Sequence, residues 1–368
     1  MKKIVTIIGA RPQFIKAAPF SRMIRSDKYN TKFQEILVHT GQHYDANMSD
    51  VFFEEMEIPK PDYHLSVGGG LHGEMTGNMI IKIEEILIKE KPDVLLIYGD
   101  TNSTLAGAVA AGKLHIPIAH VEAGLRSFWK RMPEEQNRIM SDHISTYLYS
   151  PTQTAIDNLK NEGIDYAENV GDIMLDAYIY YSQLLAKKEE REINNMLSKI
   201  GFPEELKNKE FALLTIHRAE NVDSLENLKS IFKGIGDSGK PVIFPIHPRT
   251  LNKVKGDNVE IPSNVHTIDP VGYFEILLLQ SLCSLIITDS GGMQKEAFFA
   301  KKPCITLRNQ TEWVETVSSG WNIIVGNDSE KISQTIKECQ VLENQPELYG
   351  KGNSAELILN SLEKGLSN

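Results

Sequence analysis

The fold is decided by the stretch PDVLLIYGDTNSTLAGAVAAGKLHIPIAHVEAG, residues 92–124. Two apolar runs, PDVLLIYGD and IPIAHVEAG, enclose a helical segment, STLAGAVAAGKL. Both runs are rich in leucine or β-branched residues and end in aspartate or glycine, which is typical of strands buried on both faces of a parallel sheet. The stretch therefore predicts a strand–helix–strand unit.

The same alternation extends over the whole chain of 368 residues. Further expected strands are KIVTIIGA, QEILVHTG and TYLYSPT in the first half, and FALLTIHR, PVIFPIHPR, NVHTIDP, SLIITDSGG and KPCITL in the second. We therefore expect an α/β protein with two Rossmann-like, doubly wound domains that face a cleft. The expected domains span residues 1–172 and 173–350, and a final helix over 351–368 is expected to pack back on the first domain.

Composition excludes several classes of protein. The formal net charge is −10, and no Lys/Arg-rich run stands clear of acidic neighbours, so no nucleic-acid partner is expected. No apolar run approaches the length of a membrane span. The three cysteines are odd in number and lack Cys-x-x-Cys spacing, which favours a reducing cytoplasm and argues against disulfides or a zinc site.

Three carboxylates follow or lie near predicted strand ends of the first half, where ligands bind in doubly wound sheets. Asp100 and Glu122 end strands, and Glu134 follows in a helix that begins near Pro133. Such a cluster pushes carboxyl pKa values apart and provides one acid and one base. Arg138 is expected to pair with Glu134 four residues earlier. Helix capping and a surface ion pair explain each residue singly, but not the set of three.

The segment between Glu122 and Glu134 is interpreted more plainly. LRSFWKRM, residues 125–132, is expected to be a mobile loop, and Glu135 and Lys130 are expected to be solvated surface residues.

Features that suit an anion follow other predicted strands. Gly9-Ala10-Arg11-Pro12 and Lys16 place a turn and two cations at a helix start, although a plain surface turn explains them equally well.

The run TDSGGMQKEA is more specific. Ser290, Gly291 and Gly292 would present bare N–H groups to a diphosphate, and Glu296 would accept hydrogen bonds from ribose hydroxyls. The alternative is an ordinary helix that Ser290 or Asp289 caps.

Two histidines, His217 and His247, end strands of the second half, and Arg218 and Arg249 follow them closely. These pairs favour phosphate contacts, whereas no His, Cys, Asp or Glu set has the spacing of a metal site. Acid/base groups thus dominate the first half and phosphate-binding groups the second. The division suggests a nucleotide-activated sugar that spans the cleft.

Six motifs in this order resemble the non-hydrolysing UDP-N-acetylglucosamine 2-epimerases. They are GARPQFIK, YGDTNST, HVEAGLRS, MPEEQNR, TIHRAEN and DSGGMQKEA. The resemblance implies a GT-B-like fold, a cytoplasmic homodimer, a UDP-sugar substrate, no cofactor, no metal, and a role in surface polysaccharide synthesis. It also implies elimination of UDP to a 2-acetamidoglucal, followed by re-addition.

The resemblance further implies two sets of site residues. The catalytic set is Asp100, Glu122, Glu134 and His217. The substrate-binding set is Arg11, Lys16, Arg138, His247, Ser290, Gly291, Gly292 and Glu296.

The sequence departs from the family pattern in two places. Trp313 in RNQTEWVE stands where many members have an arginine, and GGGLHGEMTGNM lacks a basic residue that helps some members bind a second, activating UDP-GlcNAc. Gln42 and His43 match part of that second site. Several motifs look most like the branch that acts on UDP-2,3-diacetamido-2,3-dideoxyglucuronate. A GT-B glycosyltransferase, a hydrolysing epimerase and a non-catalytic nucleotide-sugar binding protein are the alternatives.

Overall fold

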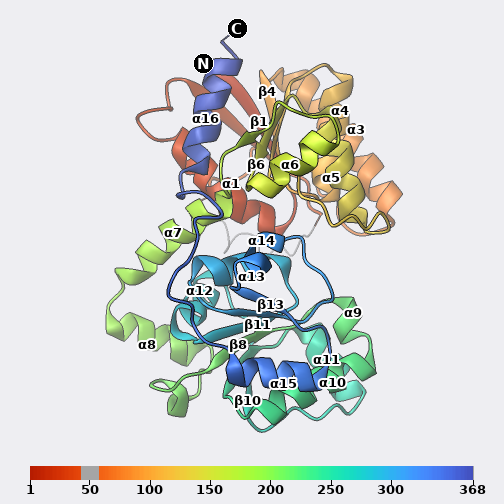
Figure 1. The fold of residues 1–368 in the computed structure, drawn as a ribbon. Coiled ribbons are helices and arrows are strands. Elements are labelled where there is room, and N and C mark those ends of the chain that lie inside the picture. The colour runs from red at the N-terminus through yellow and green to blue at the C-terminus, as the bar shows by residue number, and fades with distance from the viewer. Residues whose placement is uncertain (43–57, 368) are drawn as a thin grey trace. The chain divides into compact units, whose positions relative to one another are not determined.

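The computed structural model describes residues 1–42 and 58–367, except for the side chain of Arg11. The chain forms two compact units. Unit 1 comprises Met1–Ile179 and Glu347–Asn368, and unit 2 comprises Tyr180–Pro346. In Figure 1, each unit is a sheet with helices packed around it.

Unit 1 is built on a parallel sheet of seven strands in the order β3-β2-β1-β4-β5-β6-β7. The strands are β1 (Lys2–Ile8), β2 (Phe33–His39), β3 (Tyr63–His64), β4 (Val94–Tyr98), β5 (Ile118–Val121), β6 (Tyr147–Ser150) and β7 (Glu168–Asn169). Every residue of β4 and β5 is buried, as the apolar runs of residues 92–124 predicted.

Helices connect these strands. They are α1 (Arg11–Ile24), α3 (His72–Glu90), α4 (Asn102–Lys113), α5 (Pro133–Ile144), α6 (Gln153–Asn161) and α7 (Ile173–Ala186), which contains the unit boundary. Helix α4 packs against both α3 and α5. No helix among the described residues is both long enough and apolar enough to cross a membrane.

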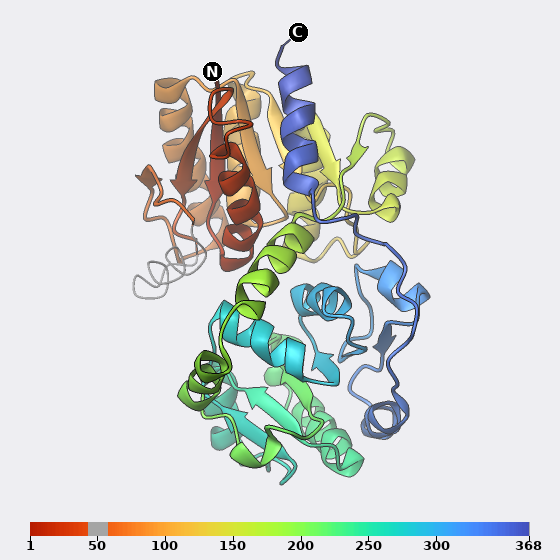
Figure 2. The same cartoon turned by 90° about the vertical axis from the view of Figure 1, so that its left-hand side faces the viewer.

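The last helix, α16 (Ser354–Gly365), belongs to unit 1 and packs against α1. Both cartoon views show it, in blue, alongside the N-terminal elements (Figures 1 and 2). The N–H groups of Ser354 and Ala355 donate to the Asp176 carboxylate at 3.0 and 2.9 Å. Burial raises the pKa of Asp176 to about 6 despite these two bonds. The buried Asp176 carboxylate therefore caps the N-terminal end of α16.

Unit 2 has a parallel sheet of six strands in the order β10-β9-β8-β11-β12-β13. The strands are β8 (Ala212–Thr215), β9 (Val242–Pro245), β10 (Val265–Ile268), β11 (Leu285–Thr288), β12 (Cys304–Thr306) and β13 (Asn322–Ile324). The helices are α8 (Glu190–Lys199), α9 (Ala219–Val222), α10 (Leu225–Ser238), α11 (Pro248–Gly256), α12 (Tyr273–Leu282), α13 (Gly291–Phe299), α14 (Val314–Ser318) and α15 (Ser329–Glu338), with a 3₁₀ turn at Glu204–Leu206.

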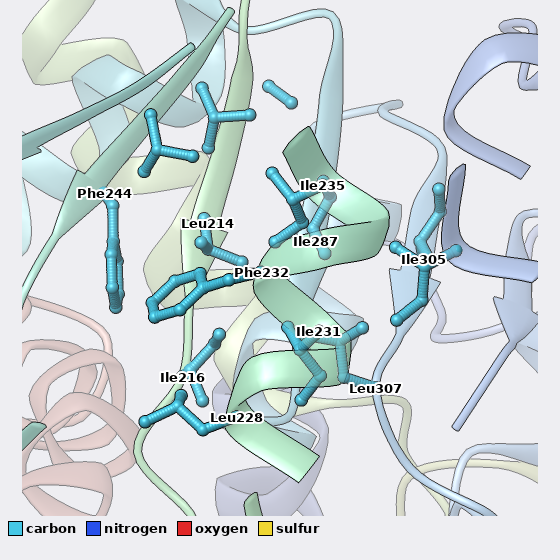
Figure 3. Packing of buried hydrophobic residues seen from close by; sticks show 14 of the residues in the cluster. Leu214, Ile216, Leu228, Ile231, Phe232, Ile235, Phe244, Ile287, Ile305 and Leu307 are labelled. Carbon is cyan, nitrogen blue, oxygen red and sulfur yellow. The ribbon is translucent and has the colours of Figure 1, made fainter. Parts of the chain in front are cut away.

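Helix α10 contributes one face of the core of unit 2 (Figure 3). Its Phe232 is buried and meets Phe244 of β9 edge to face, with ring centroids 6.3 Å apart. Leu214 of β8 and Ile287 of β11 are fully buried in the same cluster. Burial of each large apolar side chain contributes roughly 1.5–3 kcal/mol, so this core holds the central strands firmly in place.

Both strand orders reverse direction once, which confirms two doubly wound α/β sheets. The reversal lies at β1 and β4 in unit 1, and at β8 and β11 in unit 2. Ligands of doubly wound sheets bind at the carboxyl ends of the strands on either side of such a reversal. The motifs GARPQFIK and DSGGMQKEA follow β1 and β11 at these two places.

Candidate active site

The turn after β1 is packed too closely for any side chain at Gly9. A Cβ atom there would lie 2.1 Å from Thr40 Oγ1 and 2.2 Å from Ser103 Oγ. These two hydroxyls are hydrogen-bonded to each other at 2.8 Å, so neither moves away without breaking that bond. The glycine of GARPQFIK is therefore required by close approach of three loops.

Gln13 joins the turn after β1 to the end of β4. Its Oε1 accepts the N–H groups of Gly9 and Ala10 at 2.8 and 3.2 Å. Its Nε2 donates to the Tyr98 carbonyl at 2.9 Å and to Thr104 Oγ1 at 3.0 Å. The Gln13 amide thus uses both its oxygen and its nitrogen to join the ends of β1 and β4, where the strand order of unit 1 reverses. Its burial was not foreseen from the sequence, although Gln13 lies within a motif.

Lys16 and Glu122 form a buried ion pair. Nζ of Lys16 lies 2.7 Å from Glu122 Oε1, and each side chain is 8% exposed. The sequence suggested a diphosphate contact for Lys16, but its ammonium is directed at the proposed acid/base group. A carboxylate at this depth is tolerated because the paired cation offsets its desolvation.

Glu122 also has an unusual backbone. Its φ is +71°, in the left-handed region that residues other than glycine seldom adopt. The N–H groups of Glu122 and Ala123 both donate to the Tyr149 carbonyl, at 3.0 and 3.1 Å, and hold the turn. Such a conformation costs on the order of 1–3 kcal/mol and is found preferentially at functional sites.

Asp100, the other strand-end carboxylate, is bound by α5. Arg138 Nη2 lies 2.5 Å from Asp100 Oδ2, and Arg138 Nη1 lies 3.1 Å from Glu135 Oε2. Asn137 Nδ2 donates to the Asp100 carbonyl at 2.9 Å. Among the described residues, the ion pairs of Arg138 thus go to Asp100 and Glu135, and the expected pairing with Glu134 is absent.

The expectation that Glu135 is a solvated surface residue is wrong. Glu135 is 1% exposed, and its carboxylate accepts Ser127 N–H at 2.8 Å, Ser127 Oγ–H at 2.9 Å and Phe128 N–H at 2.8 Å. Burial raises the pKa of Glu135, but these bonds and the charge of Arg138 outweigh it and lower the pKa overall. Glu135 therefore fixes the start of the loop that was expected to be mobile.

The structure brings the backbone just before Asp100 close to the Glu122 carboxylate. A Cβ atom on Gly99, the residue before Asp100, would lie 3.6 Å from Glu122 Oε1 and 3.1 Å from Lys16 Nζ. Glu134 is half-buried in the first turn of α5, beside the Glu135 that binds Arg138. The side chain of Arg11 and all of His43 lie outside the described residues. Gln42 Oε1 accepts the N–H and the hydroxyl of Ser103 at 3.0 and 2.7 Å.

In unit 2, Asp289 organises the reversal between β8 and β11. Its buried carboxylate accepts the N–H groups of His217 at 3.2 Å and Arg218 at 3.0 Å, and the Asn221 amide at 3.1 Å. His217 Nδ1 lies 3.7 Å from the same carboxylate, and the ring is half exposed. The sequence identified Asp289 only as a possible helix cap, because its partners are 68 to 72 residues away.

The turn before α13 presents the two glycines of DSGG. Ser290 Oγ accepts Met293 N–H at 3.4 Å, so Ser290 is the N-cap residue. Gly291 and Gly292 open the helix and are half-buried, and N–H groups at these positions have no partner within a helix. A Cβ atom on Gly291 would lie 2.4 Å from Glu312 Oε1, whereas one on Gly292 would meet only Ser290 Oγ at 3.9 Å.

Glu296, the proposed ribose ligand, is oriented by Gln280 of α12. Gln280 Nε2 donates to Glu296 Oε2 at 2.7 Å. Both side chains are buried.

Trp313 stands against Lys295 of α13. Lys295 Nζ lies 4.2 Å from the centroid of the Trp313 ring, and the two residues are 1% and 3% exposed. A cation over the face of a tryptophan is stabilised by the ring quadrupole. Arg308 and Glu312, just before the tryptophan, form a buried ion pair at 3.0 Å. The position that carries an arginine in many family members thus faces a cation in this chain.

His247 is exposed and caps α11. Its Nδ1 accepts the N–H of Arg249 at 3.2 Å, and the Arg249 guanidinium pairs with Asp223 at 2.7 Å. Within residues 1–42 and 58–367, no three His, Cys, Asp or Glu side chains gather in a way that would hold a metal ion.

Comparison with known proteins identifies close relatives over the full length. A family model described as UDP-N-acetylglucosamine 2-epimerase matches residues 26–363. The chain is 50% identical over 366 residues to a UDP-N-acetylglucosamine 2-epimerase homolog of Methanococcus maripaludis, covering 98% of this chain and 99% of that one. It is 48% identical over 371 residues to the UDP-2,3-diacetamido-2,3-dideoxy-D-glucuronate 2-epimerase of Pseudomonas aeruginosa, with coverage of 98% and 99%.

Solved structures of UDP-GlcNAc 2-epimerases are also similar to this chain over almost its whole length. The UDP-GlcNAc 2-epimerase of Methanocaldococcus jannaschii, in complex with UDP-GlcNAc and UDP, superposes with a TM-score of 0.87 at 43% identity, covering 99% of this chain and 100% of that one. The enzyme of Neisseria meningitidis bound to UDP-GlcNAc gives a TM-score of 0.86 at 30% identity, with coverage of 98% and 100%.

Proposed function

Because the chain belongs to the UDP-N-acetylglucosamine 2-epimerase family, we propose that it inverts C2 of a UDP-2-acetamido sugar without net hydrolysis. The observation that carries the proposal is the pairing of Glu122 with Lys16 and of Asp100 with Arg138 at the carboxyl ends of β5 and β4. A reaction that moves a proton at carbon needs positioned acid and base groups of this kind.

The proposed reaction is an elimination followed by an addition. A base removes the C2 proton, the C2–H electron pair forms the C1–C2 double bond, and the C1–O bond breaks with its electrons going to UDP. UDP then adds back to the bound 2-acetamidoglucal while an acid delivers a proton to the opposite face of C2. This route suits the substrate because its C2–H is not flanked by a carbonyl group.

Unit 1 supplies the acid/base groups in this proposal. Asp100 and Glu122 each pair with a buried cation that holds the carboxylate in place, and they are the proposed bases. Glu134, half-buried in the first turn of α5, completes the set.

Unit 2 holds the leaving diphosphate in this proposal. The first N–H groups of α13, at Gly291 and Gly292, and the half-exposed His217 ring suit a phosphate oxygen. His247 adds a second donor: its Nδ1 accepts a backbone N–H, so its proton is on Nε2. Glu296, aligned by Gln280, binds the ribose hydroxyls.

Two substrates fit the relatives. UDP-GlcNAc and UDP-ManNAc are the first candidates, because the superposed M. jannaschii and N. meningitidis structures are described with UDP-GlcNAc. UDP-2,3-diacetamido-2,3-dideoxyglucuronate is the alternative, favoured by the 48% identity to the P. aeruginosa enzyme.

A substrate panel tests the function. Each UDP-sugar is incubated with the protein alone, and the sugar epimers and free UDP are separated by chromatography. We expect interconversion of C2 epimers of one substrate with almost no net UDP. Release of UDP and free sugar would indicate a hydrolysing epimerase, and turnover only with an added acceptor would indicate a glycosyltransferase.

We also propose that the protein is a cytoplasmic homodimer. Ile81 and Ile88 of α3 and Met140 and Ile144 of α5 are exposed, and both helices flank α4. Exposed apolar side chains on adjacent helices favour association. The three cysteines are free, which suits a reducing compartment. Light scattering of the wild type and of Ile81→Lys tests the dimer, and a wild-type monomer at micromolar concentration would contradict it.

A further inference from the structure

His120 of β5 is completely buried, and both of its ring nitrogens face oxygen atoms. Nδ1 lies 2.7 Å from Asp142 Oδ1 of α5, and Nε2 lies 2.7 Å from the Gly99 carbonyl oxygen. A carbonyl oxygen only accepts hydrogen bonds, so Nε2 must carry a proton. The state of the ring therefore depends on whether Asp142 also acts as an acceptor.

Asp142 has the surroundings of an ionised carboxylate. Besides the ring, it accepts Gly124 N–H at 3.1 Å and Arg126 Nη1–H at 2.7 Å. Both of these donors bind Oδ2 of Asp142, so the Oδ1 atom that faces His120 acts as an acceptor, and Nδ1 of His120 donates to it.

The charges of the buried cluster lead to the same result. Arg126 binds Asp142 on one side, and on the other it binds both oxygens of Glu162, at 2.7 and 2.8 Å. Two carboxylates and one guanidinium leave a net negative charge unless His120 is charged. His143 also contacts Glu162, at 2.9 Å, but it lies at the exposed rim. Tyr166 also lies near this cluster, and burial together with the charge of Asp142 raises its pKa.

We propose that His120 donates hydrogen bonds from both ring nitrogens and thereby positions the loops of both Asp100 and Glu122. The Gly99 carbonyl that it binds immediately precedes Asp100. The Asp142 that it binds holds the N–H of Gly124, two residues after Glu122. His120 and Asp142 thus fix the backbone just before Asp100 and just after Glu122. The catalytic roles of these carboxylates rest on the proposed function, whereas the charge of His120 does not.

The charge is measured on the wild-type protein with ¹⁵N-labelled histidine. We expect both ring nitrogens of His120 to carry a proton at about pH 8, where an ordinary histidine is neutral. A bare ring nitrogen at that pH would overturn the proposal. The measurement needs no substrate, so it remains decisive even if the epimerase function is wrong.

Positioning is measured with His120→Gln, whose single amide nitrogen cannot replace two ring nitrogens that face different acceptors. We expect kcat to fall on the order of 100-fold while KM stays within a few-fold, because a small displacement of the bases impairs chemistry more than binding. Amide exchange should also become faster at residues 98–101 and 122–125. His143→Gln, which alters only the rim of the cluster, should behave like the wild type. Unchanged kcat and unchanged exchange in a folded His120→Gln protein would contradict the positioning role.

Discussion

The two units share one topology but present different chemistry at the point where the strand order reverses. In unit 1, charged side chains lie at the strand ends, and each is paired: Glu122 with Lys16, and Asp100 with Arg138. In unit 2, the backbone N–H groups of Gly291 and Gly292 lie at the corresponding strand end. The buried Asp289 carboxylate next to them accepts the N–H groups of His217 and Arg218. One sheet order can therefore support proton transfer or diphosphate binding, depending on whether side chains or backbone reach the ligand.

Glu122→Gln should have the largest effect, because it removes a proposed base without changing its volume. We expect kcat to fall by about 10²–10⁴-fold, the usual contribution of a general acid or base. UDP affinity, assigned to unit 2, should change little by calorimetry. Glu190→Gln at an exposed position of α8 is the matched control. Near-normal turnover of Glu122→Gln would show that unit 1 does not supply a catalytic base through Glu122.

Asp176 adds a different kind of buried carboxylate to unit 1, because it accepts hydrogen bonds from two N–H groups of α16. Its pKa is raised from 3.8 to about 6 in the folded protein, so the stability that it contributes is complete below 3.8 and is lost as pH rises through about 6. The loss amounts to about 3 kcal/mol at most.

The check is the unfolding free energy of Asp176→Asn measured across this pH range. The difference between the variant and the wild type should shift in favour of the variant as pH rises. Asp157→Asn, at an exposed position of α6, should leave the pH dependence unchanged. A difference that stays constant with pH would show that Asp176 does not titrate as described.

Gly291→Ala and Gly292→Ala test the backbone site of unit 2. The first methyl group would collide with the Glu312 carboxylate, so we expect overpacking to lower stability by roughly 1–3 kcal/mol. The second methyl group has room in the free protein. Gly292→Ala should therefore keep its melting temperature but bind UDP more weakly, because its methyl group obstructs the diphosphate. If Gly292→Ala binds UDP normally, the N–H groups of α13 are not the diphosphate site.

Trp313→Arg tests how unit 2 keeps a buried cation. The arginine would face Lys295, so we expect a loss of about 2 kcal/mol from the cation–π contact alone. Adding Lys295→Glu should offset part of the loss by providing an ion pair. A double-mutant cycle in chemical denaturation measures this coupling. A coupling of zero would show that the two side chains do not stabilise each other.

Strand ends could be read from the sequence, but their partners could not. The apolar runs that end at Asp100 and Glu122 were recognisable because strands of a parallel sheet are buried on both faces. Lys16 and Glu122 are 106 residues apart, and no local pattern connects them. Glu134 and Glu135 are adjacent and chemically identical, and only the direction of α5 shows that Glu135 is the buried one. No local pattern around His120 shows that both of its ring nitrogens face oxygen atoms.

The division of chemistry between the units is tested most directly by turnover in D₂O. The protein is incubated with its UDP-2-acetamido sugar, and the sugar is followed by NMR at C2 as epimers interconvert. If paired carboxylates of unit 1 transfer the C2 proton while unit 2 retains UDP, both epimers acquire solvent deuterium at C2 and free UDP does not accumulate. Epimers that interconvert while keeping the original C2 proton would contradict the account.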